Sequence, residues 1–212
     1  MTSFLFDGPS KARGTILLAH GAGAPMDTAT MNAIAQALAS SGFRVARFEF
    51  DYMAARRVLA ARRPPPVAEK LMTEYRQAVE QLKANGPLII GGKSMGGRVA
   101  SLVADDLFDA KRVAGLLCLG YPFHPTGKPQ QLRTAHLADL ETPALIVQGT
   151  RDPFGTRDEV ETYDLAHTIE LLWLKDGDHD LKPRKSVSGF SFADHMNILA
   201  KEVSMWADRN TQ

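Results

Sequence analysis

Short runs of consecutive apolar residues recur along the chain, separated by longer segments in which apolar residues return every three or four positions. The run Thr-Ile-Leu-Leu-Ala at 15–19 and the run Leu-Ile-Ile at 88–90 lack polar alternation, which is typical of strands buried on both faces of a sheet. Similar apolar runs predict further strands at 113–119, 143–147 and 168–174, and an alternation toward Phe48 and Phe50 predicts another at 44–50.

Amphipathic helices are predicted between these strands. The first covers 28–41, with Met31, Ile34 and Leu38 on one face and Gly42 as its C-terminal stop. Residues 51–66 are expected to be irregular or weakly helical, and they end in three prolines that we interpret as a rigid turn. Further helices are expected over 67–84, from the turn after residue 90 to about 108, near 130–136, and over 157–165 and 191–208.

This alternation of strands and helices predicts the α/β class: a three-layer α/β/α sandwich around a mostly parallel, twisted sheet of about six to seven strands. The 212 residues are enough for one sizeable core, so we expect a single domain over 1–212. In sheets of this kind the active site lies outside the carboxyl ends of the strands. Only about 20 residues follow the 113–119 run before the next strand, which predicts an open site without a lid domain.

Composition narrows the possible partners. The formal net charge is +1, so a nucleic-acid partner is not indicated. The single cysteine, Cys118, lies in an apolar run and is expected to be a buried core residue. There is no basic, then apolar, N-terminal leader and no apolar run approaching 18 residues, so we expect a cytoplasmic protein without membrane association.

The most informative chemistry lies in Gly92-Lys93-Ser94-Met95-Gly96, which matches Gly-x-Ser-x-Gly after a strand and before a helix. A serine on so sharp a turn presents its hydroxyl above the sheet, and the flanking glycines allow strand and helix to pass closely. A phosphate-binding loop is a competing interpretation, but that motif needs glycine where Pro87 stands. A structural turn that happens to carry a serine is the other alternative.

Two further polar residues follow predicted strands. Asp152 comes after the 143–147 strand and His179 after the 168–174 strand, so the three side chains can meet at one edge of the sheet. A serine hydroxyl needs a base to take its proton, and the base needs an acid that fixes its tautomer. Calcium binding by Asp176, Asp178 and Asp180 is disfavoured because the loop lacks the glycine and glutamate of the usual pattern, and we expect no metal site.

The chain resembles the α/β-hydrolase family, in its small lidless form like dienelactone hydrolase, over about 15–206. The motifs that carry this resemblance are His20-Gly21-Ala22-Gly23, Gly92-Lys93-Ser94-Met95-Gly96, Gly149-Thr150-Arg151-Asp152-Pro153 and Gly177-Asp178-His179. The chain is also similar to a subgroup that includes a regulatory subunit of a eukaryotic chromatin-modifying complex.

The resemblance implies a serine hydrolase with Ser94 as nucleophile, His179 as general base and Asp152 as the acid that orients it. It also implies an oxyanion hole formed by the backbone N–H groups of Ala22 and Met95. No metal or organic cofactor is implied. Residues expected near the substrate are His20, which would also hold its loop in place, together with Gly21, Lys93, Tyr121 and His124.

The expected activity is hydrolysis of a small acyl ester or thioester, with a non-catalytic binding or regulatory module as the alternative. The sequence does not define the oligomeric state. Basic residues suggest that the substrate is anionic, because the segment from Tyr52 to Lys70 has a local net charge of +4. Solvated surface charges are the competing interpretation of this basic set. The set comprises Arg56, Arg57, Arg62, Arg63 and Lys70, with Lys93, Lys128, Arg133, Arg151, Lys182, Arg184 and Lys185 from other loops.

Overall fold

A computed structural model describes residues 2–58, 64–84 and 86–211. A seven-stranded sheet with the order β1-β3-β2-β4-β5-β6-β7 forms its centre. β1 runs antiparallel to β3, and all other neighbouring strands are parallel. The bounds are β1 (Phe4–Asp7), β2 (Thr15–Ala19), β3 (Arg44–Phe48), β4 (Leu88–Lys93), β5 (Gly115–Leu119), β6 (Ala144–Gly149) and β7 (Ile169–Leu174).

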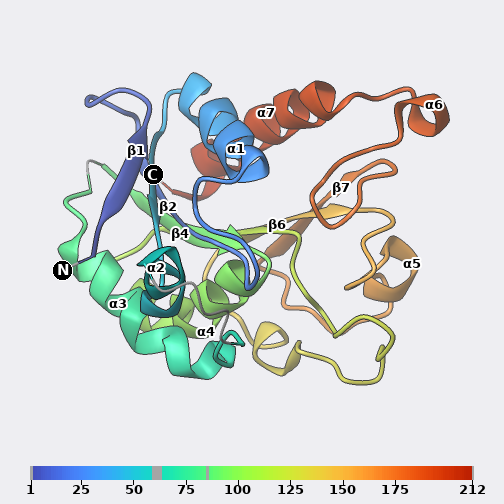
Figure 1. Ribbon diagram of the computed structural model, residues 1–212, viewed down its shortest axis with the longest axis horizontal. Helices are drawn as coiled ribbons and strands as arrows, with labels where there is room; N and C mark the ends of the chain where they lie inside the picture. The colour runs from blue at the N-terminus through green and yellow to red at the C-terminus, as the bar shows by residue number, and fades with distance from the viewer. Residues whose placement is uncertain (1, 59–63, 85, 212) are drawn as a thin grey trace.

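Helices cover both faces of this sheet, as Figure 1 shows. On one face lie α1 (Ala29–Ser40) and α7 (Phe192–Asn210), and on the other lie α3 (Met72–Gln81) and α4 (Met95–Asp109). The predicted three-layer α/β architecture is therefore confirmed. The shorter elements are α2 (Asp51–Val58), η1 (Ala68–Leu71), η2 (Ala135–Leu137), α5 (Arg157–Val160) and α6 (Lys185–Ser188).

The apolar strands supply both halves of the core. Along β2, Leu17 and Ala19 face the α3 and α4 side, whereas Ile16 and Leu18 face α1 and α7. All four side chains are fully buried. Removing a leucine or isoleucine side chain from water stabilises the fold by about 1.5–3 kcal/mol, so unbroken apolar strands fix the sheet in the middle layer.

Polar residues mark where the two outer helices of one layer begin. The Thr28 hydroxyl accepts a hydrogen bond from the backbone N–H of Met31 at 3.2 Å, at the start of α1. At the start of α7, the Ser191 hydroxyl accepts from the N–H of Asp194, while the Asp194 carboxylate accepts from the N–H of Ser191. This reciprocal capping satisfies donors that the first helical turn leaves unpaired.

Some local expectations were wrong. β1 was not predicted, although Phe4-Leu5-Phe6 is apolar, because no helical pattern follows it; it is an edge strand with Leu5 37% and Phe6 44% exposed. The predicted 67–84 helix is split into η1 and α3 and ends at Gln81, where Leu82 turns to an extended conformation with ψ 119° and buries its side chain. The predicted 157–165 helix is only one turn long.

The connection between β5 and β6, residues 120–143, contains the short helix η2 and no lid domain. The carboxyl ends of the parallel strands therefore remain accessible at one edge of the sheet. Among the described helices, none combines the length and the apolar character that crossing a membrane requires.

Candidate active site

Ser94 lies on a sharp turn between β4 and α4. Its backbone has φ 53° and ψ −117°, a conformation that L-residues rarely adopt. The N–H of Ser94 donates to the carbonyl oxygen of Leu119 at 2.9 Å, which fixes the turn to the neighbouring strand β5. Strand β4 continues through Lys93, so there is no loop between strand and serine that could wrap a phosphate group.

The two glycines of the motif are required by close backbone contacts. A Cβ atom on Gly96 would lie 2.5 Å from the carbonyl oxygen of Ala19 and 2.6 Å from that of His20. A Cβ atom on Gly92 would lie 2.6 Å from the same Ala19 oxygen. The main chain of β2 therefore passes directly beside the turn, which holds Ser94 in its strained conformation.

The Ser94 side chain is not used to cap its helix. Ser94 occupies the N-cap position of α4, where serine usually accepts a hydrogen bond from the helix backbone, but its side chain makes no such bond. Its Oγ instead lies 2.9 Å from Nε2 of His179. The geometry thus directs the hydroxyl toward a base.

His179 and Asp152 complete a chain of hydrogen bonds that starts at Ser94. Nδ1 of His179 lies 2.8 Å from Oδ2 of Asp152, and the Asp152 side chain has no solvent exposure. Two neighbours hold the carboxylate: the N–H of Phe154 donates to Oδ1 at 2.9 Å and Nε2 of Gln148 donates to Oδ2 at 3.2 Å. A carboxylate fixed in this way keeps the proton of a neutral imidazole on Nδ1 and leaves Nε2 able to accept the serine proton.

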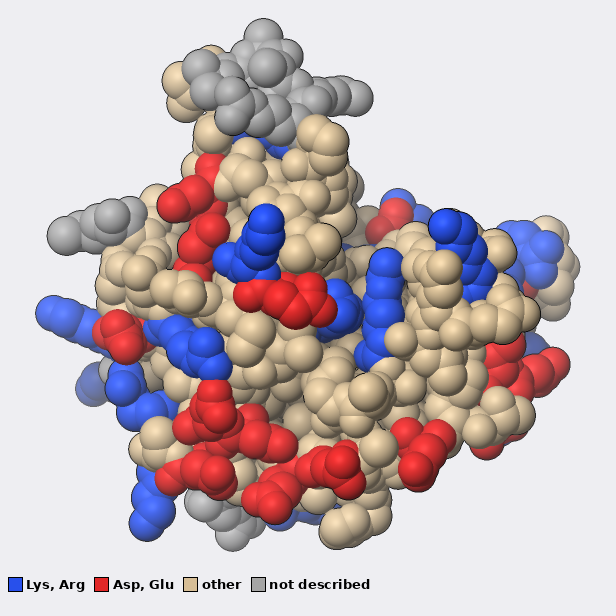
Figure 2. All heavy atoms as spheres, turned by 90° about the horizontal axis from the view of Figure 1, so that it is seen from below, with Lys and Arg blue, Asp and Glu red and all other residues tan. Residues whose placement is uncertain are grey.

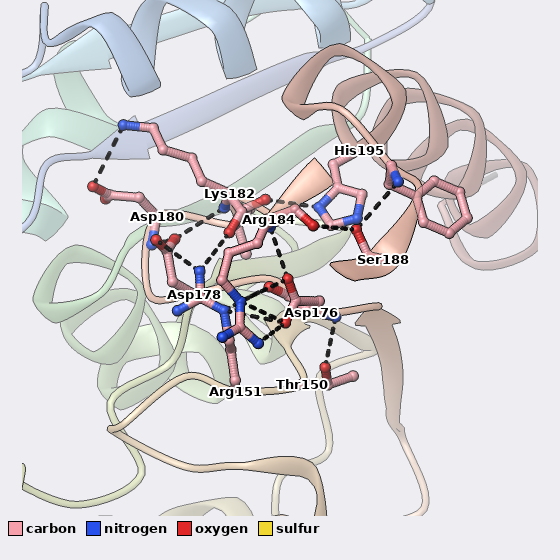
Figure 3. A network of polar contacts seen from close by, with 11 residues as sticks. Thr150, Arg151, Asp176, Asp178, Asp180, Lys182, Arg184, Ser188 and His195 are labelled. Atoms are coloured by element: carbon pink, nitrogen blue, oxygen red, sulfur yellow. Dashed lines mark hydrogen bonds and ion pairs between the residues drawn. The ribbon is translucent and has the colours of Figure 1, made fainter. Parts of the chain in front are cut away.

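The loop that carries His179 is held by ion pairs, which Figure 3 shows from close by. Arg184 forms an ion pair and hydrogen bonds with the carboxylate of Asp176, and Arg151 donates from Nε to the Asp176 carbonyl at 2.8 Å. Arg151 also lies 3.4 Å from the carboxylate of Asp178. Hydrogen bonding to Arg184 lowers the pKa of Asp176 to about 2, so this carboxylate is ionised near neutral pH. The loop is therefore fixed independently of any substrate.

Ala22 and Met95, the residues expected to form an oxyanion hole, both line a cleft that contains Ser94. Among the described residues, the backbone N–H group of neither residue has a hydrogen-bond acceptor. The Met95 group lies at the first turn of α4, where helix N–H groups and the helix dipole favour negative charge. These two donors can stabilise an oxyanion formed next to Ser94.

His20 has a structural position. Its side chain is fully buried, and Nε2 accepts a hydrogen bond from the N–H of Phe50 at 3.2 Å while Nδ1 lies 2.6 Å from the carbonyl oxygen of Gly21. Burial lowers the pKa of this imidazole, which favours the neutral form. The hydroxyl of Tyr52 donates to the Ala22 carbonyl at 3.0 Å and Nη1 of Arg56 donates to it at 3.4 Å, so three side chains hold the 20–22 loop beside Ser94.

Ser94 lies between two clefts that share Ser94, Ala22 and Phe154. The smaller cleft, of about 280 Å³, also contains His179, Lys93 and Asp180 and is bounded by the 21–25 loop and residues from α1. The larger cleft, of about 520 Å³, contains Met95 and is lined by prolines and by three charged residues, Glu69, Arg98 and Arg133. A substrate bound across Ser94 could therefore place one part in each cleft.

Of the residues expected near substrate, Gly21 and Lys93 line the smaller cleft. The Lys93 side chain is only 7% exposed, with Nζ 3.7 Å from Oδ1 of Asp180. Burial lowers the pKa of Lys93, and the neighbouring carboxylates of Asp180, Asp152 and Asp178 oppose this effect. The ammonium group therefore lies behind the nucleophile, between the cleft and the acidic loop.

Tyr121 and His124 lie elsewhere. Both side chains are buried, and neither is among the described residues that line the two clefts. The Tyr121 hydroxyl donates to the Arg133 carbonyl at 3.0 Å, and Nε2 of His124 lies 3.5 Å from the Glu159 carboxylate. The expectation that they contact substrate has no support here, because both side chains leave the strand end toward the core.

Three residues of this site were not predicted from the sequence: Gln148, Phe154 and Arg98. Gln148 is a fully buried amide at the end of β6, and the ring centroid of Phe154 lies 4.3 Å from that of His179. A lone glutamine ending an otherwise apolar strand was the available signal for Gln148.

No group of three or more His, Cys, Asp or Glu side chains suited to a metal ion occurs among the described residues.

Solved structures with this fold cover nearly the whole chain. An alpha-beta serine hydrolase homologue from Coxiella burnetii is 19% identical, with a TM-score of 0.64 over 95% of this chain and 89% of the other. A lidless serine hydrolase from Xanthomonas campestris is 18% identical, with a TM-score of 0.65 over 98% and 88%. A dienelactone hydrolase from Anabaena variabilis is 17% identical, with a TM-score of 0.67 over 100% and 93%.

At such identities these structures show a shared fold. A separate match covers residues 12–208, nearly the entire sheet and its helices, and its family is described as an alpha/beta hydrolase domain. The strand order, the sharp turn at Ser94 and this match agree. The chain therefore belongs to the α/β-hydrolase family.

Proposed function

We propose that the protein is a serine hydrolase that cleaves a small acyl ester or thioester through an acyl-enzyme. The observation that carries this proposal is the unbroken series from Ser94 Oγ to His179 Nε2 at 2.9 Å and from His179 Nδ1 to Asp152 Oδ2 at 2.8 Å. Each distance lies in the range of a hydrogen bond that supports proton transfer. The two serine hydrolases among the structures that share this fold support the same reaction class.

The reaction follows from these positions. As Ser94 Oγ attacks the acyl carbon, its proton passes to Nε2 of His179, and the buried Asp152 carboxylate stabilises the imidazolium. The carbonyl oxygen becomes negatively charged and accepts hydrogen bonds from the N–H groups of Ala22 and Met95. His179 then protonates the leaving group, and the C–O or C–S bond breaks to give the acyl-enzyme. A water molecule, deprotonated by His179, hydrolyses the acyl-enzyme and restores Ser94.

The alternative is a module that binds a partner and has no turnover, as the similarity to a regulatory subunit suggests. A domain that has lost catalysis is expected to have lost a residue of the Ser-His-Asp set or a glycine of the turn. This chain keeps Ser94, His179 and Asp152, with Gly92 and Gly96 in close backbone contact. The chemistry therefore favours the hydrolase.

Covalent labelling tests the proposal directly. A fluorophosphonate probe should label the wild-type protein at Ser94, because only an activated serine attacks the phosphorus rapidly. Ser94→Ala should abolish the labelling, and Ser101→Ala is the matched control, since Ser101 is a buried serine on the same helix. Labelling that persists in Ser94→Ala, or an unlabelled wild-type protein, would argue against the proposed function.

A further inference from the structure

The larger cleft beside Ser94 contains more positive than negative charge. Its charged residues are Arg98, Arg133 and Glu69, and the remainder of its wall is formed largely by Pro65, Pro66, Val67 and Pro122. Two guanidinium groups thus face one carboxylate. A mostly apolar cleft with a few fixed charged groups is typical of sites that orient a small molecule.

Arg98 is fixed rigidly with respect to Ser94. It lies one helical turn further along α4, and its backbone N–H donates to the Ser94 carbonyl at 3.0 Å. One terminal nitrogen donates to the Glu69 carboxylate at 2.5 Å. The buried Nε of Arg98 has no acceptor among the described residues. Glu69 is itself 53% exposed on the side chain, so solvent weakens this ion pair.

Arg133 has no carboxylate partner among the described residues. The residues outside the described ranges (1, 59–63, 85 and 212) include no Asp or Glu side chain. Its backbone is nevertheless fixed, because its N–H donates to the Phe123 carbonyl at 2.7 Å and its carbonyl accepts from the Tyr121 hydroxyl. Arg133 and Arg98 line the same cleft, and partial burial, followed by repulsion from Arg98, lowers the pKa of Arg133.

Five other basic residues of the expected set form ion pairs with carboxylates: Arg57, Lys93, Arg151, Lys182 and Arg184. Arg57 lies 2.6 Å from the Glu49 carboxylate and 2.7 Å from that of Asp27. Arg151 and Arg184 hold the His179 loop, as described above. On the face shown in Figure 2, basic and acidic side chains lie beside one another rather than forming a uniformly positive patch. Next to Ser94, the lining of the larger cleft carries one more positive than negative side chain.

The position of His179 indicates which part of a substrate would reach these arginines. His179 must protonate the leaving group, so that group has to lie on the side of Ser94 where the imidazole is exposed. The imidazole lines the smaller cleft and is not among the described residues of the larger one. The acyl chain, which extends from the carbonyl carbon in the opposite direction, consequently enters the larger cleft.

We propose that Arg98 and Arg133 bind a carboxylate at the far end of the acyl chain, so that the preferred substrates are monoesters or monothioesters of dicarboxylic acids. This inference rests on the proposed function, with Ser94 as nucleophile. Guanidinium groups bind carboxylates through charge-assisted, often bidentate, hydrogen bonds. The excess of one positive charge in the cleft matches the single charge of a carboxylate.

Matched esters test the acyl side. The p-nitrophenyl monoesters of succinate, glutarate and adipate should each be compared with the neutral ester in which a primary amide replaces the carboxylate. At low salt, kcat/KM for the best carboxylate should exceed that for its amide by about 10- to 100-fold, the effect expected of one or two charge-assisted hydrogen bonds. This ratio should fall as salt rises, because exposed charges are screened.

Three variants distinguish the effect of the arginines on the carboxylate-to-amide ratio from general effects on catalysis. Arg133→Gln should bring the carboxylate-to-amide ratio close to one, and Glu69→Gln should raise the ratio because it frees Arg98. Arg209→Gln is the matched control, because Arg209 pairs with Glu170 at the start of β7, at the opposite edge of the sheet. That variant should keep the wild-type ratio and activity.

Four results would overturn the inference. The first is equal kcat/KM for all three carboxylate and amide pairs while Ser94 is labelled by the fluorophosphonate, which removes the subsite but leaves the proposed function standing. The second is a preference found only when the carboxylate is on the leaving group, as in 4-acetoxybenzoate against 4-acetoxybenzamide. The third is an unlabelled Ser94 with no hydrolysis of any ester, which rejects both proposals. The fourth applies if Ser94 is labelled but the protein hydrolyses no ester. In that case glutarate should slow fluorophosphonate labelling of the wild type and not of Arg133→Gln, and any other outcome rejects the subsite.

Discussion

The imidazole of His179 and the carboxylate of Asp152 lie 2.8 Å apart, and the carboxylate has no solvent exposure while the imidazole side chain is 25% exposed. The acid is thus buried behind the base, and the base alone reaches the cleft. A buried carboxylate with fixed hydrogen-bond donors cannot rotate to serve another partner, so its effect on the reaction passes through the tautomer and orientation of His179.

Asp152→Asn tests this relationship. The introduced amide would either donate from its nitrogen to Nδ1 of His179 or no longer hold the imidazole proton on Nδ1. In both cases Nε2 carries the proton and cannot accept the proton of the Ser94 hydroxyl. We expect kcat to fall by about 10³- to 10⁴-fold, with little change in KM. Steady-state kinetics on a p-nitrophenyl ester measures this, with Asp158→Asn as the control, because Asp158 is an exposed carboxylate of α5 that lines neither cleft. A loss of less than tenfold would show that Asp152 does not control the base.

Glycine substitutions test the turn. In Gly96→Ala, the added methyl group would lie 2.5 Å from the Ala19 carbonyl oxygen. The methyl group is bonded directly to the main chain and the oxygen is part of it, so neither atom can move away without a shift of the backbone. We expect a loss of about 1–3 kcal/mol in the free energy of unfolding, together with loss of Ser94 labelling. Gly23→Ala is the control, since no atom lies within 4 Å of the position of its Cβ. Chemical denaturation measures the free energy of unfolding of the two variants. Equal stability of Gly96→Ala and Gly23→Ala would contradict the close contact at Gly96.

The sequence predicted the parts of the fold that depend on local pattern. Buried parallel strands give apolar runs, and Gly-x-Ser-x-Gly has a backbone requirement that few other turns share, so β2, β4 and the turn at Ser94 were found. The β1 strand was missed although Phe4-Leu5-Phe6 is a continuous apolar run, because no helical pattern follows it and it therefore lies outside the alternation of strands and helices.

The electrostatic part of the site could not be predicted in the same way. Basic residues near the carboxyl edge were identified, but whether each is paired depends on tertiary contacts between distant segments. Arg57 is neutralised by Asp27 and Glu49, whereas Arg133 lines the cleft without a carboxylate partner among the described residues. Arg98 was missed because only the helix geometry shows that it faces the same cleft as Ser94. Arg62 and Arg63 of the predicted set lie outside the described residues.

Tyr52 provides a test of how the 20–22 loop is positioned. Its hydroxyl donates to the Ala22 carbonyl at 3.0 Å, which orients the peptide group next to the proposed oxyanion donor. Tyr52→Phe removes this bond, and we expect kcat to fall by about 3- to 10-fold with a smaller change in KM, as for the loss of one neutral hydrogen bond. Tyr163→Phe is the matched control because the Tyr163 ring packs on Phe123, away from that loop. Equal kcat values for the two variants would show that the bond does not position the donor.

His136 makes folding depend on pH. Its Nε2 lies 2.8 Å from the Ser101 hydroxyl, and burial, assisted by the charge of Arg98, lowers its pKa to about 4. The unfolded chain binds a proton at this imidazole near the ordinary pKa of 6.5, whereas the folded protein does not until about pH 4. Because the unfolded state binds more protons in this window, the contribution of His136 to stability is fully present above pH 6.5 and is lost as pH falls toward 4.

His136→Gln should therefore reduce the dependence of the free energy of unfolding on pH between 6.5 and 4, since glutamine can donate to Ser101 but does not titrate. Urea denaturation at intervals across this range measures the slope, and His167→Gln, which alters an exposed histidine, is the control. The wild type and His167→Gln should lose stability more steeply than His136→Gln on acidification, with the curves becoming parallel below about pH 4. A slope that is the same in all three proteins would mean that His136 takes up its proton as readily in the folded state as in the unfolded chain.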